Sequence, residues 1–252
     1  TLMKKYTQKT VEDFDKPHLC YLGDTDVSVN FGEQIDPKLI AQVHAFDSAF
    51  NKLNLVGVIE TVPTYRAITI FFYPLIIYLE ELETSVMHLA SNHFVARSVG
   101  RVWEVPVTYG DGFGTDLKDV AARLAMTEND LIEAHTAPLY LVAMVGFLPG
   151  FSYLSGLDPI LSVPRLSEPR AKIPSSSISI GGSQTAIGSL EGPSGWHVIG
   201  RTPIRPFELE RTPPFLFKPG DRVKFRSISA REWLILDENS ARGSLILDSV
   251  EE

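Results

Sequence analysis

The sequence has a single cysteine and no excess of positive charge. Cys20 alone cannot form a disulfide within the chain or a cysteine-based metal site, and this favours a reducing, cytoplasmic compartment. The formal net charge of −8 argues against nucleic acid as a partner, because phosphates require a basic face. The six histidines do not cluster at ligand spacing, so we expect no metal bound by the protein itself.

Long apolar runs are also missing. The most apolar stretch, AITIFFYPLIIYL at 67–79, is shorter than the roughly 20 residues that a membrane span requires, and Pro74 interrupts it. This stretch predicts a buried strand followed by a helix, and no membrane association. Residues 1–16 carry lysines with no apolar segment after them, so we predict a polar arm rather than a signal peptide.

Three familiar site motifs are absent as well. The chain has no GxxxxGK[ST] phosphate loop and no GxSxG nucleophile elbow. The glycines of GDGFGT, at 110–115, are spaced GxGxG rather than GxGxxG, and this spacing predicts a plain turn instead of a dinucleotide site. Ser183 and the serines of PSSSIS, at 175–177 and 179, are better explained by hydrogen bonding at strand edges than by nucleophilic catalysis.

Residues 17–99 mix short strands with two helices, a pattern typical of a small α+β sandwich. The expected elements are a hairpin turning at Gly23-Asp24, a helix from Pro37 capped by Asp36, two strands around Pro63-Thr64 and a second helix over LIIYLEELETSVMHLASNHF at 75–94.

Residues 100–252 have a different pattern. GRVWEVPVTYG, at 100–110, predicts a strand, and two short helices are expected after it, one capped by Thr115 and one by a capping box of Thr127 and Asp130. Beyond Pro138 we find only short apolar runs broken by glycine and proline, and no long helical pattern. These runs predict a β-barrel or a β-sandwich.

Four arginines lie one or two residues from a proline, in VPRLSEPR and GRTPIRP. They are Arg165, Arg170, Arg201 and Arg205. Proline fixes the local backbone and arginine offers a planar fork for carboxylate or phosphate, so the pattern indicates an anion site. The alternative is a set of surface ion pairs with Glu168, Glu191 or Glu208.

The stretch GFLPGFSYLSGLDP, at 146–159, combines three glycines and two prolines with three aromatic rings. It fits either a stiff loop that forms a binding surface or a buried turn between barrel strands. By default the rings of Phe151 and Trp196 would lie in the core. His135 would by default be a histidine placed favourably against the dipole at a helix C-terminus.

The run from His135 to Pro203 resembles the allophanate hydrolase subunit 1 family, whose other names are the 5-oxoprolinase B-subunit family and the sporulation-kinase inhibitor family. The resemblance is carried by GFxPGFxYL, PRxxxPR and GWxxIGRTP, and it extends over nearly everything except residues 1–16. The same domain is part of the carboxyltransferase region of urea carboxylase. The resemblance implies a small α+β domain followed by a cyclophilin-like β-barrel.

The resemblance also implies site residues. His135 would be a general acid or base, Arg165 and Arg170 would hold phosphate or carboxylate, and Gln184 would orient the substrate amide. The implied substrate-binding residues are Tyr140, Phe147, Pro149, Gly150, Phe151, Tyr153, Trp196 and Arg201. In this interpretation Gly146 and Gly150 let the backbone approach a ligand at the barrel mouth, and Pro149 holds the bend.

The sequence departs from the family pattern in three places. Ser194 stands within a motif that usually reads PGGW, Gly188-Ser189 replaces a tyrosine-proline pair, and PSSSIS at 174–179 replaces a P-x-G-S-V run. These changes leave the expected fold intact and bear on the substrate.

The function implied is one subunit of an ATP-dependent 5-oxoprolinase, which opens the lactam of 5-oxoproline to glutamate. ATP would bring Mg²⁺ with it, and the cleft would be shared with a related barrel subunit, of the type found as the 5-oxoprolinase C-subunit or as allophanate hydrolase subunit 2. A third subunit is also expected, and the chain alone should be inactive. One alternative is a urea carboxylase or allophanate hydrolase component that receives carboxylated biotin from another subunit. The other alternative is a non-catalytic inhibitor of a histidine kinase.

Overall fold

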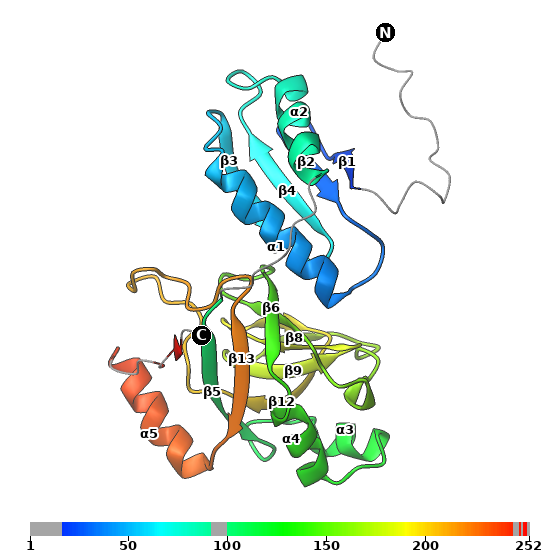
Figure 1. The fold of residues 1–252 in the computed structure, drawn as a ribbon. Coiled ribbons are helices and arrows are strands. Elements are labelled where there is room, and N and C mark those ends of the chain that lie inside the picture. The colour runs from blue at the N-terminus through cyan, green and yellow to red at the C-terminus, as the bar shows by residue number, and fades with distance from the viewer. Residues whose placement is uncertain (1–16, 92–99, 244–246, 248, 251–252) are drawn as a thin grey trace. The chain divides into compact units, whose positions relative to one another are not determined.

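The chain divides into two units, Thr1–Ser98 and Val99–Glu252, in a computed structural model that describes residues 17–91, 100–243, 247 and 249–250 (Figure 1). The polar arm expected at 1–16 lies outside the described residues. No helix in the described part of the chain is long and apolar enough to cross a membrane.

The first unit packs two helices against one sheet. Its antiparallel strands are β1 (His18–Tyr21), β2 (Asp26–Asn30), β4 (Ala67–Phe72) and β3 (Val58–Pro63), in that order across the sheet. Its helices are α1 (Pro37–Lys52) and α2 (Leu79–Ala90). Every second residue of β2 and β4 is buried, and these side chains share one core with both helices. The predicted α+β sandwich is confirmed.

The first helix of this unit begins at the predicted residue, and the second begins later than predicted. Helix α1 begins as predicted, because the Asp36 side chain accepts a hydrogen bond from the Lys38 N–H. Helix α2 begins at Leu79 and not at Leu75, so the prediction was wrong for its first turn, and its predicted end at 92–94 lies outside the described residues. Residues 73–77 form a turn in which the carbonyl of Tyr73 accepts hydrogen bonds from following N–H groups, and Leu75 is 99% exposed.

The second unit is built around a closed barrel. Its ring runs β12 (His197–Arg201), β9 (Ser177–Gly181), β10 (Gln184–Ile187), β7 (Ser152–Ser155), β6 (Tyr140–Val145), β13 (Arg222–Ser227) and β5 (Val102–Tyr109), and β5 pairs back with β12. The β5 and β13 strands are parallel and the other neighbours in the ring are antiparallel. The predicted barrel is confirmed.

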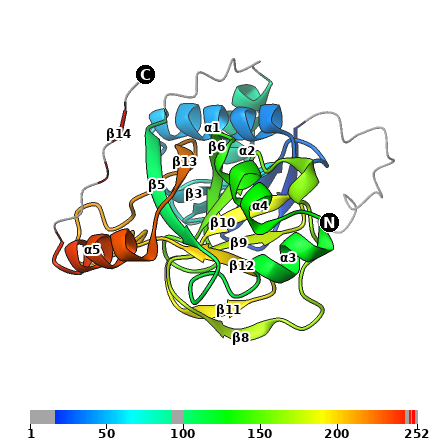
Figure 2. The same cartoon turned by 90° about the horizontal axis from the view of Figure 1, so that it is seen from below.

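Two smaller strand pairings lie outside the ring. Strand β14 (Ser249–Val250) adds to β5. Strands β8 (Arg170–Ile173) and β11 (Gly192–Ser194) pair only with each other, and Figure 2 shows them alongside β12 and β9. The β8–β11 pair therefore forms an extra layer beside one wall of the barrel.

Three helices and a short 3-10 helix complete the second unit: α3 (Leu117–Arg123), α4 (Glu128–Thr136), α5 (Ala230–Ala241) and Pro159–Leu161. The predicted capping box of Thr127 and Asp130 opens α4. The residue before α3 is Asp116 and not Thr115 as predicted. Helix α5 was not expected, because Leu234 and Ile235 lie on its exposed side and give no buried apolar stripe.

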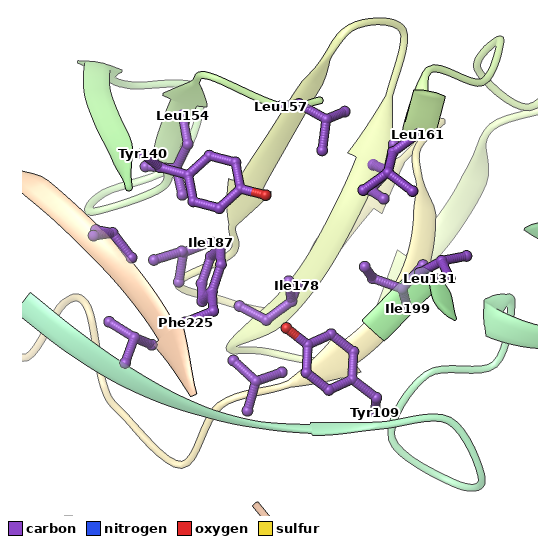
Figure 3. Close-up of a cluster of buried hydrophobic side chains, with 14 of the residues drawn as sticks. Tyr109, Leu131, Tyr140, Leu154, Leu157, Leu161, Ile178, Ile187, Ile199 and Phe225 are labelled. Carbon is purple, nitrogen blue, oxygen red and sulfur yellow. The ribbon is translucent and has the colours of Figure 1, made fainter. Parts of the chain in front are cut away.

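The barrel interior is filled by aliphatic side chains and by the rings of Tyr109, Tyr140 and Phe225, which lie within one cluster in Figure 3. Ile178 and Ile180 of β9 and Ile187 of β10 belong to this cluster, and Thr185 of β10 points to the same side. The intervening residues of β9 and β10 therefore lie on the outer face of the barrel wall.

Candidate functional site

The outer face of β9 and β10 is lined by small and polar side chains. On β9 these are Ser177, Ser179 and Gly181, because Ile178 and Ile180 point into the barrel core. On β10 they are Gln184 and Ala186, and Ala186 lies opposite Ser179 in the register. Small residues on adjacent strands leave room above the sheet for larger groups.

Aromatic rings occupy that room. The ring of Trp196 lies directly on Gly181, where an added Cβ would be 2.6 Å from the indole. The centroid of Tyr153 is 5.8 Å from that of Trp196, and the centroid of Phe151 is 4.7 Å from that of Tyr153. Phe151 and Trp196 are only 7% and 6% exposed, so these two rings are packed and not open to solvent. We call Phe147, Phe151, Tyr153 and Trp196 the aromatic cluster.

The loop at 146–151 is held tightly at one edge of this cluster. The Gly146 N–H donates to the Phe151 carbonyl at 3.0 Å, and the Phe151 N–H donates to the Leu148 carbonyl at 3.0 Å. Phe147 has a φ of 74°, an unusual conformation for a bulky residue, and its ring is 61% exposed. The loop is therefore held by hydrogen bonds within its own backbone, and it presents Phe147 to solvent.

Gly150 has a role other than the one expected. Its φ is 76°, and a Cβ there would lie 2.8 Å from the Phe207 Cβ and 3.1 Å from the Pro206 carbonyl oxygen. The glycine lets this loop pack against residues 206–207 of the same chain. Close approach of the backbone to a ligand was the prediction, and the structure gives a packing reason instead.

Two polar atoms on the outer face have no partner among the described residues. Gln184 is 8% exposed and its Nε2 makes no hydrogen bond. The buried Oγ of Ser179 makes none either. Buried polar groups normally bind a protein group, a water or a ligand, because an unpaired donor costs about 1–3 kcal/mol. These two atoms therefore identify the outer face as a candidate binding site.

Arg165 supplies positive charge beside the aromatic cluster. Its guanidinium carbon lies 5.4 Å from the centroid of the Trp196 ring. Within the described residues Arg165 forms no ion pair, and the expected alternatives Glu191 and Glu208 pair instead with Lys172 and Arg211. An arginine that has an aromatic contact and no carboxylate can bind an anionic ligand.

Arg170 is engaged with the protein itself. Its two terminal nitrogens donate to the two carboxylate oxygens of Asp116 at 2.7 and 2.6 Å. Asp116 is 5% exposed, and it also accepts a hydrogen bond from the Val198 N–H at 2.7 Å. This contact joins β8 to the start of α3 and to β12, so it is a structural ion pair rather than a free anion site.

His135 and Tyr140 lie on the inner side of the barrel wall. His135 is fully buried, with Nδ1 2.9 Å from the Tyr109 hydroxyl and Nε2 2.9 Å from the Thr185 Oγ1. Burial lowers the pKa of His135 to about 3, so the ring is neutral. The Tyr140 hydroxyl donates to the His135 carbonyl at 2.7 Å. Neither side chain reaches the aromatic cluster, and both nitrogens of His135 already have partners.

Residues 17–217 match the family described as carboxyltransferase domain, subdomain C and D. The chain belongs to this family. The B subunit of 5-oxoprolinase from Bacillus subtilis (strain 168) is 34% identical over 233 residues, which cover 87% of this chain and 96% of the relative.

Solved structures extend the comparison with the carboxyltransferase-domain family. The crystal structure of TTHA0988 is 30% identical with a TM-score of 0.73, and the match covers 81% of this chain and 40% of that chain. The K. lactis urea amidolyase shares the fold, with a TM-score of 0.79 at 19% identity over 94% of this chain and 16% of that one. In both cases the relative has a much longer chain than the part that matches.

The three departures from the family pattern can now be located. The Ser194 hydroxyl accepts a hydrogen bond from the Trp196 N–H at 3.0 Å, so it helps to position that ring. A Cβ at Gly188 would lie 3.3 Å from the Ser177 carbonyl oxygen, a tight fit. Ser176 has a φ of 56°, a conformation that glycine adopts without strain. The departures therefore lie next to the outer face or its neighbouring turns.

Sequence reasoning considered Ser179 only as a nucleophile, not as a binding residue, and it did not single out Asp116. The alternation in SSISIGG was a usable signal for Ser179, because it separates the serines from the isoleucines. No local signal identified Asp116, whose partner Arg170 is 54 residues away.

Proposed function

We propose that this chain is one subunit of an ATP-dependent 5-oxoprolinase that acts with a related barrel subunit and a third subunit. The observation that carries the proposal is the similarity to the B subunit of a 5-oxoprolinase over 96% of that relative. A second such relative, from Escherichia coli O157:H7, is 34% identical over 94% of its length. Relatives of nearly equal length are the best guide to a shared activity.

The outer face suits the substrate of that reaction. 5-Oxoproline has a five-membered ring, a lactam amide and a carboxylate. The Nε2 of Gln184 has no partner within the described residues and can donate to the lactam carbonyl oxygen. The rings of Tyr153 and Trp196 can pack against the apolar carbons, and Arg165 can bind the carboxylate. In this proposal Gln184 and Arg165 bind and orient the substrate.

The chemistry needs activation of the amide. ATP with Mg²⁺ would supply a phosphoryl group to the lactam carbonyl oxygen in a cleft shared with a partner subunit. ADP leaves in this transfer. Water then attacks the carbonyl carbon and the carbon–nitrogen bond breaks. A second water releases the phosphate, so the products are glutamate, ADP and phosphate. We assign no proton transfer to His135 and no phosphate binding to Arg170, because their polar atoms are engaged within the protein.

The first test is the activity of the assembled enzyme. The chain is purified with the two other subunits from its source organism, and ATP hydrolysis that depends on 5-oxoproline is measured together with glutamate release. We expect activity from the complex and little or none from this chain alone. Absence of such activity in a correctly assembled complex would contradict the proposal. Carboxylation of urea by a complex that supplies carboxylated biotin would favour the urea carboxylase alternative.

The second test concerns Gln184. Gln184→Met keeps the length of the side chain and removes the amide, so we expect the KM for 5-oxoproline to rise about tenfold, the value of one lost hydrogen bond. Gln42→Met on α1, in the first unit, is the matched control and should leave KM unchanged. An unchanged KM in Gln184→Met would remove this residue from the substrate site.

A further inference from the structure

Unpaired donors also gather where β12 ends beside α5. Arg201 is the last residue of β12 and is half-buried. Its Nε donates to the Ser175 carbonyl at 3.2 Å, and its guanidinium carbon lies 5.3 Å from the centroid of the Trp233 ring. In the part of the chain that the structure describes, no carboxylate forms an ion pair with Arg201 and its terminal nitrogens have no partner.

Trp233 adds a second donor to the same place. Its ring is 7% exposed and packs 4.9 Å from the ring of Phe113, measured between centroids. The indole Nε1 is buried and makes no hydrogen bond within the described residues. An indole N–H can only donate, so it needs an acceptor that this part of the chain does not provide. This position therefore has a buried N–H donor and lacks an acceptor for it among the described residues.

The turn that holds Arg201 is strained. Ser176 follows the carbonyl that accepts from Arg201, and its φ of 56° is unfavourable for a residue with a side chain. The turn is fixed by a hydrogen bond of 2.7 Å from the Ser176 hydroxyl to the Ile204 carbonyl. Strained backbone is kept where the surroundings over-determine it, and such positions cluster at ligand sites.

The local charge also favours an anion. Arg205 pairs with Asp237 of α5 at 2.6 Å, so this carboxylate is already engaged, and Arg201 has no ion pair within the described residues. Burial lowers the pKa of Arg201 and the charge of Arg205 lowers it further, while Asp237 raises it. Burial and the charge of Arg205 both disfavour the charged form of Arg201, and a bound anion would stabilise that form.

We infer that Arg201 and Trp233 form a binding site for a small oxyanion, either a phosphate or a carboxylate group. The planar guanidinium presents two free nitrogens for paired hydrogen bonds with two oxygens of the ligand, and the Trp233 ring fixes the guanidinium plane. Arg201 lies opposite Ser177 in the sheet, whereas Trp196 covers Gly181, four residues further along β9. The oxyanion site therefore lies at a different position along β9 from the aromatic cluster.

The test uses the purified chain and two probes. Inorganic phosphate and acetate are titrated separately in a calorimeter at constant ionic strength, with chloride as the reference anion. We expect saturable binding of at least one probe, and the stronger probe identifies the ligand as phosphate or carboxylate. Binding of neither probe would overturn the inference.

Variants locate the site. Arg201→Gln should weaken binding at least tenfold, because it removes the charge and the fork. Trp233→Phe keeps an aromatic ring and removes the N–H, so we expect a smaller loss of about three- to tenfold. Arg226→Gln, an exposed arginine of β13 that pairs with Glu104 and Glu232, is the control and should bind as the wild type does.

Two outcomes would contradict the assignment to these residues. One is unchanged affinity in a folded Arg201→Gln variant, with folding checked by circular dichroism. If that variant does not fold, Trp233→Phe decides the question, and unchanged affinity in it then overturns the inference. Equal loss in Arg226→Gln would show general attraction to positive surface and not a site.

Discussion

Polar side chains on the two faces of strand β10 differ in whether they have hydrogen-bond partners within the described chain. Thr185 points inward, and its Oγ1 bonds to the Nε2 of His135 and to the Ser179 carbonyl. Gln184, one residue earlier, points outward, and its Nε2 has no partner within the described chain. The inner polar groups therefore stabilise the fold, whereas the outer ones have binding capacity that the chain itself does not use. Loss of a polar group on the inner face should alter stability, and loss of a polar group on the outer face should alter binding.

The largest expected effect is acid destabilisation through His135. Its pKa is about 3 in the folded protein and near 6.5 when unfolded, so the unfolded chain binds the proton more readily below pH 6.5. The contribution of His135 to the free energy of unfolding is complete above about pH 6.5. It falls by about 1.4 kcal/mol for each pH unit from there toward pH 3. Urea denaturation should therefore show a loss of about 2–3 kcal/mol between pH 7 and about pH 4.5 from this residue.

His135→Gln separates this contribution from that of the carboxylates. The variant should be less stable than the wild type at pH 7, because glutamine fits the paired positions poorly, but its stability should fall less steeply with acid. Parallel pH dependence in the two proteins would show that His135 is not the buried neutral group described here.

The second expected effect tests Arg170, which sequence reasoning placed in the active site. Arg170→Ala leaves the carboxylate of Asp116 buried with only the Val198 N–H as a partner. The side chain of Arg170 is 38% exposed, so we expect a moderate loss of about 2 kcal/mol in the free energy of unfolding. Thermal and urea denaturation measure it. An Arg170→Ala variant with a higher Kd for anions and unchanged stability would show that Arg170 belongs to the binding site.

A smaller effect is expected at Gly181. In Gly181→Ala the new Cβ would lie 2.6 Å from the Trp196 ring, so the ring must shift. We expect a loss of about 1–2 kcal/mol together with a change in tryptophan fluorescence. Gly112→Ala is the control, because nothing lies within 4 Å of its Cβ position. Unaltered fluorescence in Gly181→Ala would mean that Trp196 does not lie on this face.

The smallest expected effect on stability is at Phe147. Phe147→Gly removes an exposed ring and relieves the positive φ, so the net change should stay within about 1 kcal/mol. Phe147→Ala loses the same ring and keeps the strain. We therefore expect the glycine variant to be about 1 kcal/mol more stable than the alanine variant, the reverse of the usual order. The usual order in urea denaturation would contradict the strained conformation.

The sequence predicted most of the fold because the strands of the barrel alternate and because two helix starts, at Asp36 and at Thr127 and Asp130, have local signatures. Two features could not be predicted in this way. Leu75 belongs to an apolar run yet lies exposed in a turn, and α5 buries Trp233 while exposing Leu234 and Ile235. Periodicity fails where apolar side chains do not face the core of their own unit.

The candidate site was only partly predictable for a related reason. The motif around Phe151 and Trp196 indicated that these rings belong together, and the structure brings them into one cluster. Which polar groups are already paired depends on distant segments, as in the ion pair between Arg170 and Asp116. An ion pair within the fold is what separates a structural arginine such as Arg170 from Arg165 and Arg201, which form none among the described residues.

The closure of the barrel has a consequence for how the protein is made. Strand β5 pairs with β13, whose first residue Arg222 lies opposite Val102, 120 positions earlier in the chain. At about 5–20 residues per second, the ribosome needs roughly 6–24 seconds to add that length of chain. For most of this interval β5 has neither of its ring partners, and an unpaired strand of this kind can associate with other nascent chains. The yield of folded protein should therefore depend on synthesis rate and on chaperones more strongly than its final stability suggests.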